Sequence, residues 1–227
     1  MHEIDTPMDA DLAAAGAART GEHPVGRRAK RAFDLLVAVP ALLLLSPLLL
    51  GIAIAIRLSD GGPALYRHTR IGLDGRPFAC LKFRSMVRDA DAVLARHLAQ
   101  NEVAAREWAE TRKLKDDPRI TRLGDVLRKT RVDELPQLVN IVRGDMSVVG
   151  PRPIVAAEIE KYGPHIDDYV RARPGLTGAW QVSGRSDVTY GERVRLDTDY
   201  VNNWSLARDV VIIVRTIPAV LASRGSY

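Results

Sequence analysis

Cysteine is almost absent from this 227-residue chain. The single cysteine, Cys80, excludes an intrachain disulfide and any metal cluster built on cysteines. Because Cys80 lies in the apolar segment 78–81, we expect it to pack as a small buried hydrophobic residue. The lack of disulfides suits a reducing compartment for the globular part of the chain.

Aromatic residues make up 5% of the chain, and phenylalanine occurs three times. Leucine, valine, isoleucine and alanine must therefore supply most of the core. The histidines are scattered, with no pair at a spacing that places two ligands on one helix face: His2, His23, His68, His97 and His165. No Walker loop, zinc site or Ser-His-Asp set stands out, so the commonest signatures of P-loop, zinc and serine-triad enzymes are missing.

Acidic residues are outnumbered by basic ones, which gives a formal net charge of +5 and an isoelectric point of about 9.5. This balance favours an anionic partner, such as nucleic acid, anionic lipid or a phosphorylated substrate. The charge is spread along the chain and aromatic residues are few, so we predict no nucleic-acid partner. The length fits one domain, or one domain with an appendage.

The chain divides into three predicted regions. Residues 1–28 are rich in alanine, glycine, threonine and charge, without a helical or strand period, and are interpreted as a disordered tail. They do not form a secretory signal, because the apolar run comes too late and no small-residue cleavage site follows it. We expect a membrane segment over 29–58 and a compact cytoplasmic domain over 59–227.

The apolar run Leu35–Ile56 contains 22 residues, no charge and one hydroxyl group, that of Ser46. Its length makes it a transmembrane helix candidate, and a simple span is the default interpretation. Two prolines argue against a straight helix, since Pro47 lies in the middle of the run and Pro40 lies earlier in it. We therefore predict a break at Ser46 and Pro47.

The flanks of the run also argue against a span. Asp34 lies at its edge, where we expect it to pair with Lys30 or Arg31 rather than enter lipid alone. Basic residues lie on both sides, so the positive-inside rule gives a spanning segment no preferred orientation: Arg27, Arg28, Lys30 and Arg31 before it, and Arg57, Arg67, Arg70 and Arg76 after it. We predict a re-entrant helix-break-helix that dips into the inner leaflet and returns.

The remaining pattern predicts an α+β fold that is mainly helical. Asp74 and Gly75 lie between two β-prone runs and predict a short hairpin over 64–85. Helices are expected over 88–113, over 119–129, from Asp133 to Arg143, and from Ser205 to Ser223. Two of these helices show an apolar stripe that we expect to face the core: Ile120, Leu123, Val126 and Leu127 in one, and Leu206, Val210, Ile213, Val214, Ile217 and Leu221 in the other.

The first motif that could carry chemistry is the segment Arg131–Leu138. Asp133 fits a helix cap, Glu134 complements the helix dipole, and Pro136 fits a first turn, so capping alone explains the pattern. The alternative is that the helix end directs its N–H groups and both carboxylates at a phosphate bound to Mg²⁺. A carboxylate can also act as a nucleophile and form an acyl phosphate. The octapeptide by itself leaves these alternatives open.

Two loops rich in glycine and proline follow. The first, 144–153, is either a plain connection or a rigid support that presents Arg152 for bidentate phosphate binding. The second, 173–186, carries Trp180 and Arg185, which could stack on a base and hold a diphosphate, although a tryptophan is more commonly buried. The segment 196–200 adds Asp197 and Asp199, which fit a solvated helix start equally well.

Taken together and in this order, the motifs resemble the bacterial sugar transferase family, the small monotopic phosphoglycosyl transferases. The resemblance runs from about Lys30 to Tyr227 and includes these segments: Lys30–Asp34, Ser46–Pro47, Lys82–Met86, Asp116–Thr121, Asp133–Gln137, Gly144–Ser147, Gly150–Pro153, Arg173–Gly178 and Gln181–Arg185. Its members that start exopolysaccharide assembly with a hexose are the most similar in overall appearance.

The resemblance implies roles for the acidic pair. Asp133 is expected to be the catalytic nucleophile that attacks the β-phosphate of a UDP-sugar, which gives a phosphosugar-enzyme intermediate and UMP. A polyprenol (undecaprenyl) phosphate then accepts the phosphosugar. Glu134 is expected to bind the cofactor Mg²⁺.

The resemblance also assigns the cations and the membrane segment. Arg152 and Arg185 are expected to hold the nucleotide and its phosphates. Arg128 is expected to be a phosphate-holding cation near the pair, with Lys82 in support. Ser46 and Pro47 make the break of a re-entrant helix in the inner membrane, which places the active site on its cytoplasmic face among the inner-membrane lipids.

Several points stay open at this level. Galactose and glucose are the favoured sugars, whereas the polyprenol length, the oligomeric state and the pathway are not disclosed. The chain resembles the minimal form of the family, without the multi-helix membrane domain of larger members. The competing interpretation is a non-catalytic membrane scaffold of a polysaccharide export complex, which would not need the acidic pair together with the loop that carries Arg152.

Overall fold

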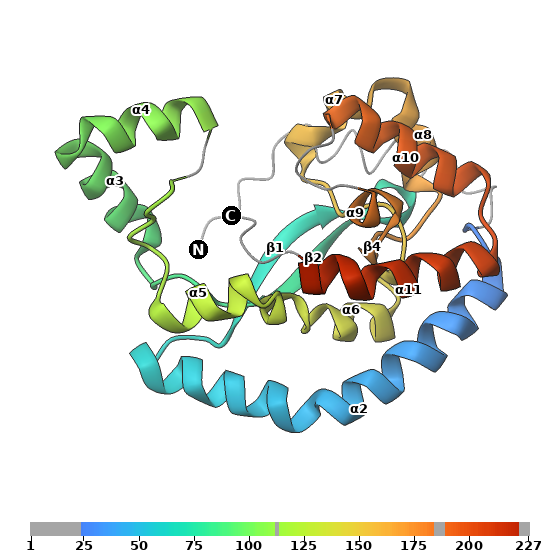
Figure 1. Ribbon diagram of the computed structural model, residues 1–227, viewed down its shortest axis with the longest axis horizontal. Helices are drawn as coiled ribbons and strands as arrows, with labels where there is room; N and C mark the ends of the chain where they lie inside the picture. The colour runs from blue at the N-terminus through green and yellow to red at the C-terminus, as the bar shows by residue number, and fades with distance from the viewer. Residues whose placement is uncertain (1–23, 112–113, 184–188, 223–227) are drawn as a thin grey trace. The chain divides into compact units, whose positions relative to one another are not determined.

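The computed structural model describes residues 24–111, 114–183 and 189–222, most of which are helical (Figure 1). The chain divides into two compact units. The first unit contains residues 24–45, 67–81 and 137–222, and the second contains residues 46–66 and 82–136. The predicted α+β class, mainly helical, is confirmed. Most of the predicted tail, 1–28, lies outside the described residues.

The first unit is built around two short parallel strands, β3 (Ser147–Val149) and β4 (Gly175–Thr177). In their register, Ser147 is opposite Gly175 and Val149 is opposite Thr177. All three residues of β3 are buried, as expected for the centre of a core. Helices contact this pair of strands or one another around it: α6 (Gln137–Arg143), α9 (Ala179–Val182) and α11 (Leu206–Ala222).

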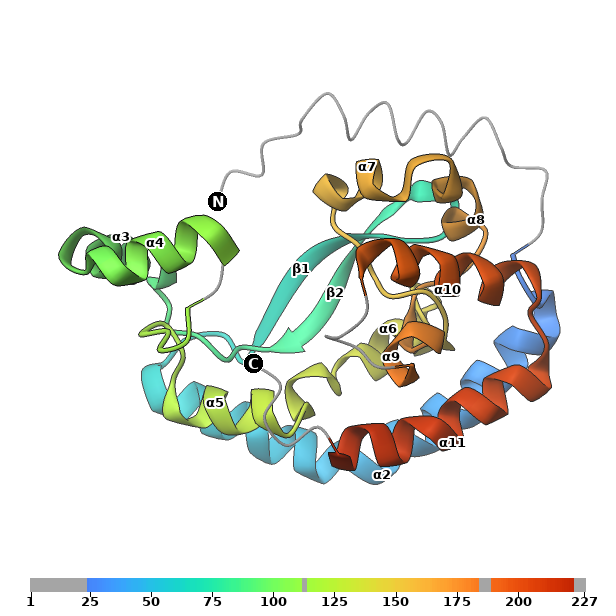
Figure 2. The same ribbon diagram turned by 45° about the horizontal axis from the view of Figure 1, so that its top comes forward.

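An aromatic cluster forms a second core in the same unit. Tyr162 and Tyr169 are buried and meet edge to face, with ring centroids 5.2 Å apart. Tyr190 meets Tyr162 in the same manner at 6.1 Å. The helices that supply these rings lie together in Figure 2: α7 (Ile159–Tyr162), α8 (Ile166–Val170) and α10 (Tyr190–Asn202).

The second unit packs helix α5 (Arg122–Lys129) against the later part of the apolar helix. Its core contains Ile56, Phe83 and Leu127, all less than 5% exposed. Helix α5 begins later than predicted, because the Thr121 side chain caps it by accepting a hydrogen bond from the Gly124 N–H at 2.9 Å. Val126 is 55% exposed, so the predicted stripe of this helix is only partly buried.

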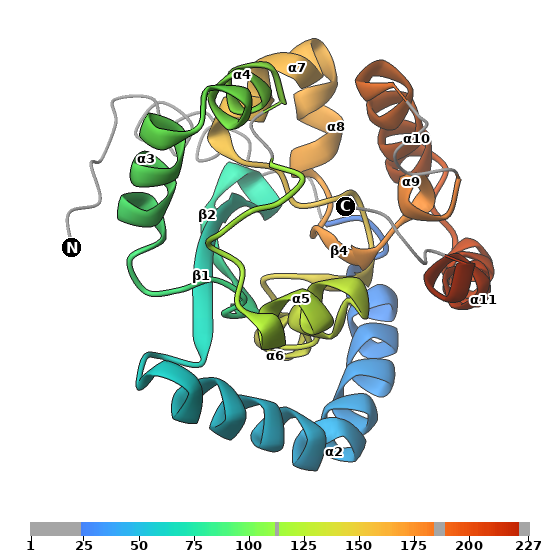
Figure 3. The ribbon, with the colours of Figure 1, turned by 60° about the vertical axis from the view of Figure 1, so that its left-hand side comes forward.

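The single helix predicted over 88–113 is wrong. The structure has two helices instead, α3 (Ala90–Gln100) and α4 (Glu102–Thr111), which contact each other in Figure 3. Asn101 separates them with an extended backbone (φ −138°, ψ 99°). Its Oδ1 accepts a hydrogen bond from the Ala104 N–H at 3.0 Å, so a short polar side chain replaces a helical hydrogen bond and starts a new helix.

The apolar run forms α2 (Arg27–Asp60), a helix of 34 residues. Among the described residues it is the one helix long and apolar enough to cross a membrane, and 6% of its most apolar stretch is buried. The α-helix is continuous through Pro40, Ser46 and Pro47, where a break was predicted. The boundary between the two units falls at this point, between Leu45 and Ser46.

The predicted hairpin is confirmed as the two-stranded sheet of β1 (Leu65–Ile71) and β2 (Pro77–Phe83). Its turn has left-handed backbone at Asp74 (φ 57°) and Gly75 (φ 73°), the conformation that an Asp-Gly pair favours. Cys80 in β2 is 2% exposed, so its prediction as a buried hydrophobic residue is also confirmed.

Helix α11 buries a different face from the one predicted. Val210, Val214 and Ile217 are 47%, 60% and 61% exposed, whereas Ile212 is 5% exposed. The inward face is set by Asp209, which is completely buried because it is hydrogen-bonded inside the first unit. The predicted stripe therefore lies mostly on the surface.

Candidate functional site

The acidic pair lies in a short 3₁₀ turn, η2 (Val132–Glu134), and not at a helix cap. Arg131 occupies the capping position with a left-handed backbone (φ 58°), and helix α6 begins only at Gln137. Pro136 has no N–H to give to Val132, and the Leu135 N–H closes the turn on that carbonyl at 3.2 Å. The prediction that a helix begins near Asp133 is therefore wrong.

Two cations act on the pair. Lys82, in β2, donates to Glu134 Oε1 at 2.7 Å, and both side chains are about a quarter exposed. Burial raises the pKa of Asp133, and the charge of Glu134 raises it further, while Lys82 and Arg128 act in the opposite direction. The second unit thus brings together four of the predicted site residues. A carboxyl group perturbed by burial and by named charges is typical of a functional site.

The donor atoms of the pair suit Mg²⁺. This ion binds one or two carboxylates and completes its octahedron with water and substrate phosphate oxygens. Asp133 and Glu134 are consecutive carboxylates whose charges act on each other, although Lys82 already donates to one oxygen of Glu134. Within 24–111, 114–183 and 189–222, no group of three or more His, Cys, Asp or Glu side chains could hold a metal ion.

Arg152 lies in the first unit, on a loop that packs closely against the backbone after Arg173. The Gly150 N–H donates to Thr177 O at 2.9 Å, and the Gly175 N–H donates to Pro151 O at 2.8 Å. A β-carbon on Gly150 would lie 2.3 Å from Arg173 O, so only glycine fits there. These contacts fix the backbone immediately before Arg152.

The Arg152 guanidinium lies over the ring of Trp180, 5.1 Å from its centroid. Trp180 is half-buried on α9, so it is neither a core residue nor a free stacking platform. Arg185, the other predicted phosphate-holding arginine, lies outside the described residues.

The interpretation of 196–200 as a solvated helix start is wrong. Asp197 and Tyr200 are 2% and 1% exposed, inside α10. Asp197 accepts a hydrogen bond from the Tyr162 hydroxyl at 2.8 Å, and burial raises its pKa to about 6. Asp199 is half-buried and pairs with Arg208. The helix begins earlier than the pattern suggests, at Tyr190, where Thr189 caps it.

Sequence reasoning identified Asp34 as paired but missed most of its environment. Lys30 Nζ lies 3.9 Å from Asp34 Oδ1 and donates to Asp209 Oδ2 at 2.7 Å, and all three side chains are buried. The Ser147 hydroxyl donates to Asp34 at 2.8 Å. Arg31 does not pair with Asp34, because its guanidinium donates to the last carbonyls of α6. These contacts join α2 to segments more than a hundred residues away.

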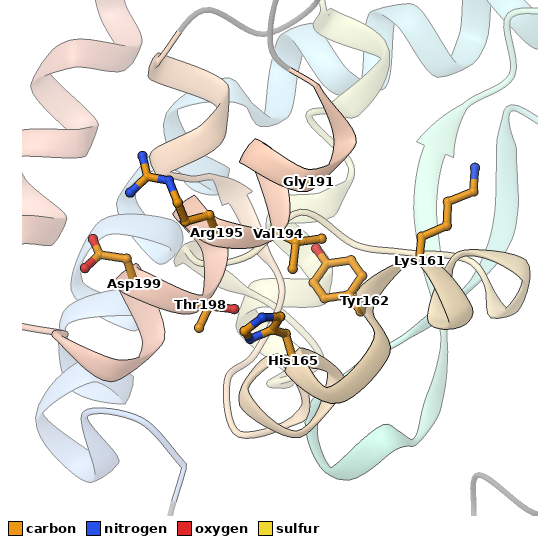
Figure 4. Close-up of a pocket in the computed structure, with 8 residues that line it drawn as sticks. All are labelled: Lys161, Tyr162, His165, Gly191, Val194, Arg195, Thr198 and Asp199. Carbon is orange, nitrogen blue, oxygen red and sulfur yellow. The ribbon is translucent and has the colours of Figure 1, made fainter.

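A surface pocket lies between α10 and the segment from α7 to α8. Figure 4 shows Tyr162 and His165 on one side of it, with Thr198 and Arg195 from α10 on the other. None of the predicted site residues lines this pocket. Of the residues in the motifs, Asp199 lines it, and the residues expected to bind or react with substrate do not.

Comparisons with known proteins agree with the motifs. The chain matches the family described as "Bacterial sugar transferase" over residues 25–223. It is 57% identical over 205 residues to the exopolysaccharide production protein ExoY of Rhizobium meliloti, which covers 90% of this chain and 91% of that protein.

Two further relatives have names that state a reaction. The chain is 49% identical to the undecaprenyl-phosphate galactose phosphotransferase of Salmonella typhimurium, over 87% of this chain and 41% of that protein. It is 42% identical to the UDP-glucose:undecaprenyl-phosphate glucose-1-phosphate transferase of Caulobacter vibrioides, over 87% of this chain and 72% of that protein. The chain belongs to the bacterial sugar transferase family.

Proposed function

We propose that this protein transfers a sugar-1-phosphate from a UDP-sugar to undecaprenyl phosphate and releases UMP, as the first membrane step of exopolysaccharide or glycan assembly. The observation that carries the proposal is the half-buried Asp133 carboxyl group beside Glu134, with the charges of Lys82 and Arg128 acting on it. The names of the relatives support the same donor and acceptor. They also support galactose and glucose as the leading sugars.

In the proposed first step, a carboxylate oxygen of Asp133 attacks the β-phosphorus of the UDP-sugar. The bond from that phosphorus to the oxygen bridging to the α-phosphate breaks, and UMP leaves with the electron pair. The product is an acyl phosphate that carries the sugar. In the second step, a phosphate oxygen of the polyprenol phosphate attacks the same phosphorus and regenerates the Asp133 carboxylate.

The charges around the pair suit this chemistry. A diphosphate repels a carboxylate nucleophile unless cations offset its charge. Lys82 and Arg128 supply such charge to Asp133 within the second unit. Mg²⁺ held by Glu134 would add positive charge at the diphosphate.

We propose further that α2 is re-entrant, so that the protein is monotopic on the cytoplasmic face of the inner membrane. Near the start of α2, Lys30 pairs with Asp209, which lies in the polypeptide that follows the helix. At its end, Asp60 pairs with Arg84, which also follows the helix. Residues 61–111, 114–183 and 189–222 contain no second candidate span. Contacts of both helix ends with the same later polypeptide support entry and exit on one side.

Cysteine accessibility tests this topology. Cys80 is buried, so a Cys80→Ser background allows single cysteines to be placed at Gly21, before the helix, and at Gly61, after it. In sealed inner-membrane vesicles, the re-entrant arrangement predicts that an impermeant maleimide labels both positions from the same side. Labelling of the two positions from opposite sides would show a simple span and overturn this part of the proposal.

The reaction is tested with purified protein, Mg²⁺, undecaprenyl phosphate and a panel of UDP-sugars. We expect UMP release with UDP-galactose or UDP-glucose. Without the acceptor, we expect a sugar-phosphate mass increment on the peptide that contains Asp133. Asp133→Asn should abolish both signals, whereas Asp125→Asn, an exposed residue paired with Lys129, serves as the matched control. Full turnover by Asp133→Asn would exclude this nucleophile, and no UMP release from any UDP-sugar would favour the scaffold.

A further inference from the structure

Arg193 is a buried cation that the motifs and the proposed reaction do not use. Its side chain is 7% exposed, on the first turns of α10. Its guanidinium carbon lies 5.0 Å from the ring centroid of Tyr190, 5.3 Å from that of Trp180 and 6.0 Å from that of Tyr162. Nη1 donates to Glu158 Oε1 at 3.2 Å. Three rings and a carboxylate therefore enclose one guanidinium.

This cage is connected to Arg152 by two routes. Trp180 contacts both guanidiniums, with that of Arg152 at 5.1 Å and that of Arg193 at 5.3 Å from its ring centroid. Asp197 Oδ2 lies 3.9 Å from Arg193 Nε, and its carboxylate accepts a hydrogen bond from the Arg152 backbone N–H. One route holds the side chain of Arg152 and the other holds its backbone. Moving Arg193 would disturb both.

The hydrogen bonding of Arg193 is incomplete. Its Nε and Nη2 atoms are buried and have no hydrogen-bond partner in the part of the chain that the structure describes, and the same holds for Trp180 Nε1. A buried arginine that served only to stabilise the fold would be expected to satisfy its donors, because leaving them unpaired is costly. Departures of this kind are expected near functional sites.

We propose that Arg193 is a positioning residue for the donor site: it fixes Trp180 and Asp197, and through them it fixes Arg152 for the nucleotide diphosphate. This inference rests on the proposed function, in which Arg152 binds the UDP-sugar. Arg193 itself does not touch substrate. Its planar guanidinium matters, because the compact ammonium group of a lysine lacks the fork that reaches Trp180 and the Glu158 carboxylate at the same time.

A kinetic split tests this role. In a ping-pong reaction, kcat/KM for each substrate reports only its own half-reaction. Arg193→Met should lower kcat/KM for the UDP-sugar about tenfold and leave kcat/KM for undecaprenyl phosphate unchanged. Arg193→Lys preserves the charge beside Glu158 and should recover only part of the loss. Arg195→Met is the matched control, because Arg195 is on the same helix, is 66% exposed and extends away from Tyr162 (Figure 4).

Direct binding separates this inference from the proposed function. By isothermal titration, UDP affinity should fall about tenfold in Arg193→Met and stay unchanged in Arg195→Met. Equal losses in both kcat/KM values would indicate misfolding and overturn the positioning role, as would wild-type UDP affinity in Arg193→Met or full recovery by Arg193→Lys. If the wild type releases no UMP but binds UDP with an affinity that falls about tenfold in Arg193→Met, the proposed reaction fails and the positioning role stands.

Discussion

The ammonium nitrogen of Lys82 lies 2.7 Å from Oε1 of Glu134, so strand β2 and turn η2 are joined by an ion pair next to Asp133. Both side chains are about a quarter exposed, and a pair of this kind contributes at most about 1 kcal/mol to stability. Its main consequence is electrostatic. Lys82 compensates the negative charge that Glu134 adds beside Asp133. A bound diphosphate would increase that negative charge further.

Replacing Lys82 should therefore affect catalysis more than folding. We expect Lys82→Met to lower kcat/KM for the UDP-sugar about 100-fold, a loss of the size seen when one group that stabilises developing charge is removed. Lys82→Arg should recover part of it, and the unfolding midpoint of Lys82→Met should change little. UMP-release kinetics and thermal unfolding measure the two effects. A fall in stability with unchanged kinetics would make Lys82 a structural residue only.

Glu134 should determine the response to magnesium. If Glu134 binds the ion, Glu134→Gln should raise the Mg²⁺ concentration needed for half-maximal UMP release about tenfold or more, because the loss of a ligand charge weakens binding of a hard cation. Glu160→Gln, on the exposed part of α7, is the control. Removal of Mg²⁺ by EDTA should stop wild-type turnover. A loss of activity in Glu134→Gln without any change in Mg²⁺ dependence would contradict the metal role.

The sequence predicted those structural features that depend only on residues close together in the chain. The turn at Asp74 and Gly75 needs only two left-handed residues, and the apolar run 35–56 needs only its own composition. The division at Asn101 had a signal that was overlooked, since asparagine in a helix competes for backbone N–H groups. Pro136 gave a similar signal that the helix starts after it.

Contacts between residues far apart in the sequence could not be predicted from local patterns. Lys30 and Asp209 are 179 residues apart, and nothing in either local sequence indicates the other. The pair with Lys30 determines which face of α11 is buried. Because the local sequence of α11 does not show this pair, its apolar stripe was predicted to face the core. The order of the motifs indicated the four site residues of the second unit. Arg193 lies in none of these motifs, and only its contacts in the folded protein indicate a role.

The pair of Lys30 with Asp209 should stabilise the attachment of α2 to the first unit. Lys30→Met leaves Asp209 completely buried without its cation, and breaking one partner of a buried pair typically costs about 3 to 5 kcal/mol. Lys129→Met removes an exposed pair with Asp125 and should cost less than about 1 kcal/mol. Denaturant unfolding in detergent compares them. Equal, small effects of the two substitutions would show that the buried pair does not hold the helix.

Gly124 should tolerate no side chain. A β-carbon there would lie 1.9 Å from Ser85 O, and the clash is with backbone, which cannot rotate away. We expect Gly124→Ala to lower the free energy of unfolding by at least about 2 kcal/mol. Gly191→Ala on α10 has no atom within 4 Å of its new β-carbon and should be neutral or stabilising by at most about 1 kcal/mol. Thermal unfolding distinguishes them, and equal stability of the two variants would contradict the close approach.

Asp197 should make stability depend on pH in an unusual direction. Burial raises its pKa from 3.8 to about 6, so the folded protein binds this proton more tightly than the unfolded chain does. The Asp197 contribution to stability therefore falls as the pH rises from about 4 to about 6 and is constant above that range. A difference of about two pKa units corresponds to about 3 kcal/mol. Asp197→Asn lacks this titration.

The free energy of unfolding, measured in denaturant at pH 4 and pH 7 for both proteins, tests this expectation. The value for the wild type minus that for Asp197→Asn should be about 2 kcal/mol smaller at pH 7 than at pH 4, because the unfolded carboxyl group is already partly ionised at pH 4. Changes in hydrogen bonding caused by the amide are the same at both pH values and cancel in this comparison. Asp125→Asn, at an exposed position, should give no such difference. A larger wild-type advantage at pH 7 would mean that Arg193 and the Arg152 backbone stabilise the Asp197 carboxylate more than burial opposes it.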